Sequence, residues 1–229
     1  MGECRGVTGF HHWFFLDELA EALGLSFAAY AVRDGVGLVG VVPVLLKRVG
    51  PVATSNYLPV PYVGPVVVDG RLTDVIAAMR PRLARQRTVV TKWSFAAAAE
   101  LDLPALHRLG YTIERHTNFY SDPAVPVEEQ WSRFAPDVRA NVRKAERAGV
   151  TCGPSTEAEI MTYFPRLVSA PYLRQRTPLD YPEAGAKMMA GRFIDDPRIV
   201  WRSVRKEGEF LGISALIADG GRACGWQLL

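Results

Sequence analysis

The sequence predicts an α+β protein built from two similar units, each with helices flanking a mixed, mostly antiparallel sheet. Segments with helical periodicity alternate with short runs rich in valine, leucine and alanine, and turn signals such as Asp34-Gly35 and Asp219-Gly220-Gly221 join those runs. The same arrangement occurs on both sides of a basic segment in the middle of the chain. We therefore expect a first unit at residues 1–135 and a second unit at residues 136–229, which begins with the basic segment.

The composition limits which binding partners and which cellular compartment are expected for this chain. With 48% hydrophobic residues among 229, the chain has ample material for a core, and its formal charge of +3 permits a phosphorylated partner without requiring one. Its three cysteines are isolated and form no CxxC pair, so we expect no disulfide framework and no metal site, and a reducing cytoplasm fits best. No stretch has the pattern of a signal peptide or the length of a membrane span, so we expect a cytoplasmic protein without stable membrane insertion.

The first unit is predicted to open with an amphipathic helix over residues 10–23, which Gly24 ends. A hairpin follows, because strand-like apolar runs flank Asp34-Gly35. Residues 57–68 are the next extended piece, and since its three prolines cannot donate to a ladder we expect an edge or irregular strand. The remaining predicted elements are helices over 72–87 and 103–109 and strands over 88–95 and 111–120.

In the second unit Thr156 and Glu159 form a capping box, which predicts a helix that runs to about Leu167. Residues 170–182 are expected to be an irregular polar segment, followed by a helix over 182–193. A meander of three strands over 199–205, 210–218 and 223–229 comes last. Because the chain stops at Leu229 within this sheet, we expect the second unit to be incomplete.

The basic segment at residues 133–150 is predicted to be a helix followed by a short strand. Pro136 suits a first helical position, and Gly149 stands where the end of a helix favours a residue with positive φ. An apolar stripe recurs at helical spacing and is expected to be buried. The stripe consists of Val138, Val142 and Ala145.

The same helix carries a basic ridge that is the first candidate binding surface. The ridge consists of Arg139, Arg143, Lys144 and Arg147, with the three arginines at intervals of four residues. Stacking like charges on successive turns costs a few tenths of a kcal/mol per pair. Such a ridge is either a solvated helix face or a cradle for phosphate, and local pattern alone favours the solvated face.

A second candidate follows about 30 residues later, where Arg174, Arg176 and Tyr181 fall in the predicted irregular segment. The planar fork of arginine matches phosphate and carboxylate oxygens, and binding residues often lie on loops. The alternative is an ordinary solvated loop.

Other sequence patterns do not support a site. Residues 35–40 spell G-x-G-x-x-G, but they lie in the predicted hairpin and lead into a strand, whereas the dinucleotide fingerprint must open a helix. The four histidines lack metal-ligand spacing, and the chain contains neither a G-x-S-x-G elbow nor a Walker A sequence.

Residues 139–150, with the sequence RANVRKAERAGV, closely resemble a helix of the Fem-type peptidoglycan-bridge aminoacyltransferases and their N-acyltransferase kin. That family carries R-x-N-[IV]-[RK]-K-A-x-[RK]-x-G-V at the entry to its second acyltransferase domain. An aromatic opening with Trp13, then DGVGLVGVVPVLL, then YLPVPYVGPVVV are similar in the same order, and the stretch from Arg174 to Tyr181 is similar to an Arg- and Tyr-bearing loop of the family.

The resemblance implies two GNAT-like subdomains and the transfer of an amino acid from aminoacyl-tRNA to an amine of a peptidoglycan precursor or another peptidyl acceptor. It implies that the ridge holds phosphates of tRNA or of a nucleotide-linked acceptor, and that Arg176 and Tyr181 lie at the acceptor. No cofactor beyond the aminoacyl-tRNA donor is implied. Aminolysis of an activated ester needs mainly positioning and an oxyanion donor, so no catalytic residue is assigned.

Two departures from the family leave alternatives open. The opening helix lacks the phosphate-contacting lysine of well-known members and is acidic instead, with Asp17 and Glu18. The part of the second subdomain that is expected to carry a donor-binding loop lies beyond Leu229. The alternatives are an acyl-CoA-dependent GNAT acyltransferase and a degenerate GNAT-like binding module.

Overall fold

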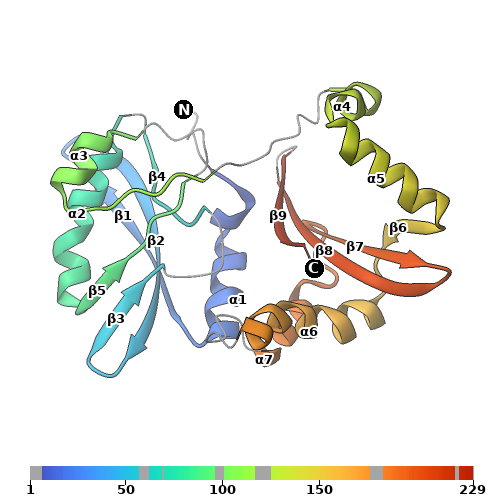
Figure 1. The fold of residues 1–229 in the computed structure, drawn as a ribbon. Helices are drawn as coiled ribbons and strands as arrows, with labels where there is room; N and C mark the ends of the chain where they lie inside the picture. Colours follow the sequence, from blue (N-terminus) through green and yellow to red (C-terminus); the bar gives the residue numbers. More distant parts are fainter. Residues whose placement is uncertain are drawn as a thin grey trace. The chain divides into compact units, whose positions relative to one another are not determined.

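The computed structural model describes residues 7–56, 62–68, 70–95, 101–116, 125–175, 183–219 and 222–228. Contacts divide the chain into two compact units, Met1–Thr117 and Asn118–Leu229, each with its own sheet and helices (Figure 1). The predicted α+β class is confirmed in both units. The second unit thus begins at Asn118, before the basic helix and the short helix that precedes it, whereas the sequence predicted that it begins at residue 136.

The first unit is built on a mixed sheet with the order β1-β2-β3-β5, and β4 pairs with the far end of β2. All its pairs are antiparallel except β3 with β5, which are parallel. The strands are β1 (Ser26–Arg33), β2 (Leu38–Val49), β3 (Val52–Ser55), β4 (Val66–Val67) and β5 (Thr88–Thr91). The hairpin predicted at Asp34-Gly35 is confirmed, and the Asp34 carboxylate accepts hydrogen bonds from the Val36 and Gly37 amides.

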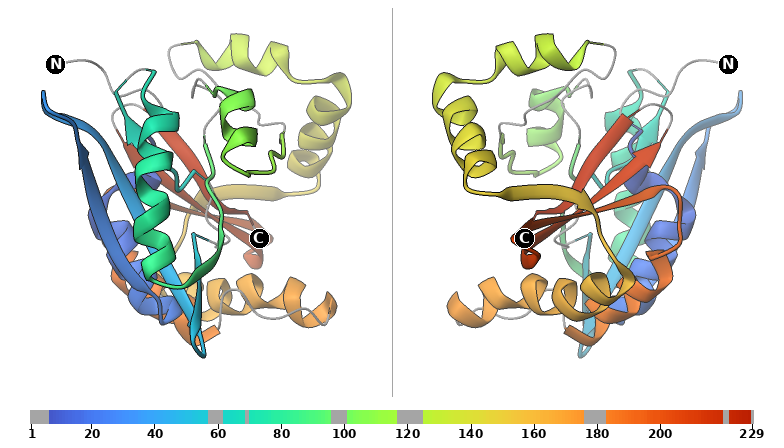
Figure 2. Two further views of the ribbon diagram at one scale, coloured as in Figure 1. Left: turned by 90° about the vertical axis from the view of Figure 1, so that its left-hand side faces the viewer. Right: turned by 90° about the vertical axis from the view of Figure 1, so that its right-hand side faces the viewer.

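Helices cover both faces of this sheet, which explains why consecutive residues of β2 are buried. Figures 1 and 2 show α1 (Trp13–Leu23) and α2 (Leu72–Arg85) on opposite faces. A short turn of 3-10 helix, η1 (Gly9–His11), precedes α1, and α3 (Leu103–Arg108) packs beside α2 through Leu106. One core cluster joins α2 to the sheet. Its fully buried members include Val42, Val44 and Val75.

Strand β2 pairs with different strands at its two ends, and the Asn56 side chain bonds the backbone between those two pairings. Residues 46–49 of β2 pair with β3, whereas residues 40 and 41 pair with β4. Between them the buried Asn56 side chain accepts a hydrogen bond from the Leu45 amide at 2.8 Å and donates one to the Pro43 carbonyl at 3.0 Å. Asn56 has a φ of 54°, which asparagine tolerates better than most residues. The amide group therefore replaces two ladder bonds where the chain leaves the sheet.

The second unit is an antiparallel meander with the order β6-β7-β8-β9. Its strands are β6 (Val150–Pro154), β7 (Ile199–Lys206), β8 (Glu209–Asp219) and β9 (Arg222–Leu228). Figures 1 and 2 show α6 (Glu157–Gln175) and α7 (Glu183–Phe193) along one face, with α4 (Val127–Arg133) and α5 (Pro136–Arg147) on the side away from them. In the core, the Phe164 ring meets the Trp201 ring edge-on, and the Trp201 indole donates to the Phe193 carbonyl.

Two sequence predictions about elements are wrong. The helix expected to end near Leu167 continues to Gln175, so residues 170–175 are helical despite Pro171. Ile160, Phe164 and Val168 are buried at intervals of four residues and pack the helix on the core up to Val168. Residues 111–116 form no strand, and the short strand β3 was not predicted.

Residues 111–116 are held by side chains instead of by a ladder. The Tyr111 hydroxyl accepts a hydrogen bond from the Trp93 indole, and Tyr111 and Ile113 pack on the cluster around Ile76 and Leu106. Residues 57–61 of the proline-containing stretch and residues 117–120 lie outside the described residues, and the described remainder of that stretch includes the two-residue strand β4. No helix among the described residues has the length and apolar character to cross a bilayer.

Removing the Asn56 amide should destabilise the first unit. We expect Asn56→Gly, which accommodates the positive φ, to lower the free energy of unfolding by about 2–4 kcal/mol, because the Leu45 amide and the Pro43 carbonyl lose their partner. Urea unfolding measures this, with Asn141→Ala on the exposed surface of α5 as the matched control. Equal stability of the two variants would show that the sheet does not depend on the amide.

Candidate functional site

The basic segment forms α5, as predicted. Pro136 is its first residue, Asp137 lies in its first turn, and Gly149 follows its C-cap with a φ of 78°. The helix is amphipathic, but none of its residues is buried. It therefore contributes little to the core and presents most of its surface to solvent.

The basic ridge is exposed and available to a ligand. Arg143, Lys144 and Arg147 are exposed and Arg139 is half-buried. Within the part of the chain that the structure describes, no carboxylate lies within ion-pair distance of these four side chains. The Arg143 guanidinium lies 5.9 Å from the centre of the Trp131 ring, a cation–π contact that leaves its N–H groups free to donate.

The prediction that the apolar stripe of α5 is buried is wrong. Val138 is 41% exposed and Val142 38% exposed, while Ala145 is half-buried. Phe134, at the joint between α4 and α5, is 48% exposed and meets the Trp131 ring edge-on. Periodicity showed that one face of the helix is apolar, but the sheet completes its core with α6 and α7 on its other side.

The second candidate cluster is only partly described. Arg174 is exposed in the last turn of α6, so it lies on a helix and not in the irregular segment that the sequence suggested. Arg176 and Tyr181 lie outside the described residues.

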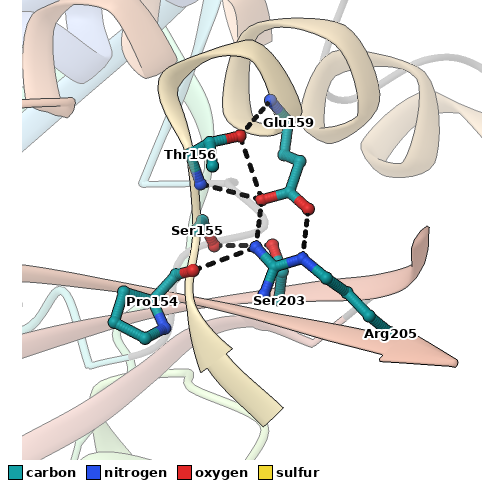
Figure 3. A network of polar contacts seen from close by, with 6 residues as sticks. All are labelled: Pro154, Ser155, Thr156, Glu159, Ser203 and Arg205. Atoms are coloured by element: carbon teal, nitrogen blue, oxygen red, sulfur yellow. Dashed lines mark hydrogen bonds and ion pairs between the residues drawn. The ribbon is translucent and has the colours of Figure 1, made fainter. Parts of the chain in front are cut away.

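A polar network that the sequence revealed only in part fixes the start of α6 (Figure 3). The predicted capping box is present: the Glu159 amide donates to the Thr156 hydroxyl, and the Thr156 amide donates to the Glu159 carboxylate at 2.8 Å. Arg205 on β7 donates to both oxygens of that carboxylate: its Nε lies 2.6 Å from Oε1, and its Nη2 donates to Oε2. The same Nη2 also donates to the Pro154 carbonyl. A network that joins β6, α6 and β7 in this way has a structural role.

Arg205 lowers the pKa of Glu159 to about 2, mainly by donating hydrogen bonds to its ionised form, with a smaller contribution from Thr156. Sequence reasoning identified the capping box but missed Arg205, which is 46 residues away in the chain. The carboxylate and the threonine hydroxyl thus pair the amides of Thr156 and Glu159 at the start of α6.

Comparison with known proteins identifies the fold. No family model matches the sequence, and no curated protein matches it significantly. The crystal structure of FemX is 16% identical with a TM-score of 0.55, and the match covers 90% of this chain and 53% of that one. The C-terminal domain of a putative lysylphosphatidylglycerol synthetase from Agrobacterium fabrum is 9% identical with a TM-score of 0.52. That match covers 98% of this chain and 64% of the other.

The chain therefore shares the fold of these two proteins and spans about half to two thirds of their length. The predicted fold class, with two helix-flanked sheets of the GNAT-like type, is confirmed. Identities of 16% and 9% establish the fold alone, so the chemistry has to be argued from this chain's own residues.

The Glu159–Arg205 pair should stabilise the protein in a pH-dependent way. The pKa of Glu159 is lowered from 4.5 to about 2 on folding, so its contribution is present above pH 4.5 and is lost as the pH falls towards 2. We expect Glu159→Gln to lower Tm at pH 7 and the deficit to shrink progressively below about pH 4.5. Glu157→Gln, an exposed carboxylate in the same turn, is the control. A deficit that stays constant from pH 7 to pH 3 would contradict this role.

Proposed function

We propose that this chain is an aminoacyl-tRNA-dependent N-acyltransferase that forms an amide on an amine of a peptidyl or peptidoglycan-precursor acceptor. One observation carries the proposal. A chain with the fold of FemX over 90% of its length bears the RANVRKAERAGV helix at the start of its second sheet. Three of the four ridge cations are exposed and Arg139 is half-buried, and none has a carboxylate partner among the described residues.

The ridge has the chemistry to hold phosphates. Its three arginines repeat every four residues, so their attachment points lie about 6 Å apart along the helix axis and form a continuous row of donors. Arginine binds phosphate oxygens with a planar fork, and Trp131 holds one face of the Arg143 guanidinium while its donor edge stays open. A solvated helix without a polyanionic partner has no use for such a row, which costs repulsion between neighbouring turns.

The proposed reaction is aminolysis of an ester. The acceptor amine attacks the carbonyl carbon that links the amino acid to the terminal ribose of tRNA, and a C–N bond forms as the C–O bond breaks. The amine loses a proton and the ribose oxygen gains one, so no oxidant or external energy source is needed. Holding the amine against the ester supplies most of the acceleration, and a donor to the oxyanion supplies more.

We place Arg176 and Tyr181 at the acceptor, with Arg174 in the last turn of α6 just before them. A guanidinium and a phenol suit the phosphate or carboxylate groups of a nucleotide-linked peptide. Both substrates of the proposed reaction are cytoplasmic, and the reaction needs no bound cofactor.

The direct test offers the chain a mixture of charged tRNAs with labelled amino acids, together with amine acceptors that include a nucleotide-linked peptide. We expect an amide product and an equimolar release of uncharged tRNA. A parallel arm replaces the tRNAs with acyl-CoA. Consumption of acyl-CoA alone would favour the acyl-CoA-dependent alternative, and binding without turnover in either arm would favour a GNAT-like binding module.

Neutralising the ridge should weaken tRNA binding and flatten its dependence on salt. For the triple variant Arg139→Ala, Arg143→Ala, Arg147→Ala we expect the slope of log K against log salt concentration to fall by about 2–3, because each lost phosphate contact removes about 0.9.

The matched control removes the same charge from exposed arginines of the first unit, as Arg80→Ala, Arg85→Ala, Arg108→Ala. Filter binding at several salt concentrations measures both variants. Equal slopes for the two triple variants would assign the ridge to a solvated surface.

A further inference from the structure

Strand β1 forms one edge of the first unit's sheet, and β2 is its pairing partner among the described strands. The Leu45 amide and carbonyl both bond Asn56, on the other side of β2. Phe27, which lies opposite Leu45, therefore forms a pair without hydrogen bonds, and its own N–H and C=O point away from β2. The alternation of an antiparallel ladder gives Ala29 and Ala31 the same orientation.

This outer edge of β1 is open. Ala29 and Ala31 are exposed, and no hydrogen bond joins the outward groups of β1 to another described residue. The strand has eight residues without a proline, a lysine or an acidic side chain, which are features that commonly protect an edge from pairing. By contrast, the edge strand β5 has four residues, and β6 ends in Pro154. Figure 2 shows β1 as the outermost strand of its sheet.

The order of side-chain sizes along β1 fits a second copy of the same strand. In an antiparallel pair with its twofold axis at Ala29, each bulky side chain lies opposite a small one of the other copy. The opposed pairs are Phe27 with Ala31, Tyr30 with Ala28, and Val32 with Ser26. The same register sets the outward backbone groups of the two copies opposite one another, and each such pair exchanges two hydrogen bonds. Self-complementarity of this kind is what a twofold interface requires.

The charge on β1 favours the same arrangement. Arg33 is exposed and has no ion-pair partner among the described residues. In the twofold pair it lies opposite Leu25 of the second copy, just after the end of α1, and the C-terminal end of a helix favours a cation. The two copies of Arg33 lie at opposite ends of the paired strands, about 27 Å apart at about 3.4 Å per residue.

We propose that two copies of this chain associate through β1 in antiparallel register about Ala29, so that the sheets of their first units become one continuous sheet. Trp13 on α1 is 60% exposed and packs on Phe27 with 4.8 Å between the ring centres, next to the new contact. An extended peptide of unrelated sequence would use the same backbone groups, but it would account for neither the order of sizes nor the position of Arg33. A single pair of strands buries less than a permanent interface does, so the dimer is reversible.

Sedimentation equilibrium of the full chain across micromolar concentrations tests the proposal. We expect the mass to rise with concentration from 25.3 kDa towards twice that value. Ala29→Pro should weaken self-association by about 25-fold, at about fivefold for each of the two hydrogen bonds lost at the axis. Because the Ala29 amide points away from β2, the proline leaves the pairing of β1 with β2 in place.

A charge exchange at the axis tests the register. Ala29 faces its own copy, so Ala29→Lys and Ala29→Glu should each weaken self-association by about fivefold, whereas an equimolar mixture of the two variants should recover this loss. Val89→Lys and Val89→Glu, on the exposed surface of β5, are the matched controls and should leave self-association unchanged. Circular dichroism and the urea midpoint confirm that each variant is folded.

Three outcomes would overturn the proposal. A chain that stays monomeric at every concentration would leave the edge to an extended peptide of another protein. Self-association that Ala29→Pro does not weaken would assign the contact to another surface. A mixture of the lysine and glutamate variants that associates no better than either alone would exclude the register about Ala29. These measurements contain neither tRNA nor an acceptor, so their outcome is independent of the aminoacyl-transfer assay.

Discussion

Both units depend on one constraint: a backbone hydrogen-bonding group that leaves a ladder or a helix inside the protein must find another partner. In the first unit the Asn56 amide pairs the Leu45 amide and the Pro43 carbonyl, where β2 passes from one partner strand to another. At the more exposed start of α6 in the second unit, Glu159 and Thr156 pair each other's amides, and Arg205 pairs the carbonyl at the end of β6. Single polar side chains thus complete the sheet edges and helix ends that the backbone leaves open.

Helix α5 contacts β6 but contributes no buried residue to the core of the second unit. None of its residues is buried, and its cations have no carboxylate partners among the described residues. Pro136 and Asp137 at its start and the turn at Gly149 at its end favour this helix locally. Its exposed cations are therefore available to a ligand.

The sequence was most informative where the signal is local. The turns at Gly24 and Gly149, the capping box and the hairpin at Asp34 each rest on residues within a few positions of one another, and all are confirmed. The misses concern features that local pattern does not reveal: α6 continues through Pro171 to Gln175, and Arg205 reaches back to the capping box from β7. Periodicity likewise identified the apolar face of α5 but contains no information about what covers it.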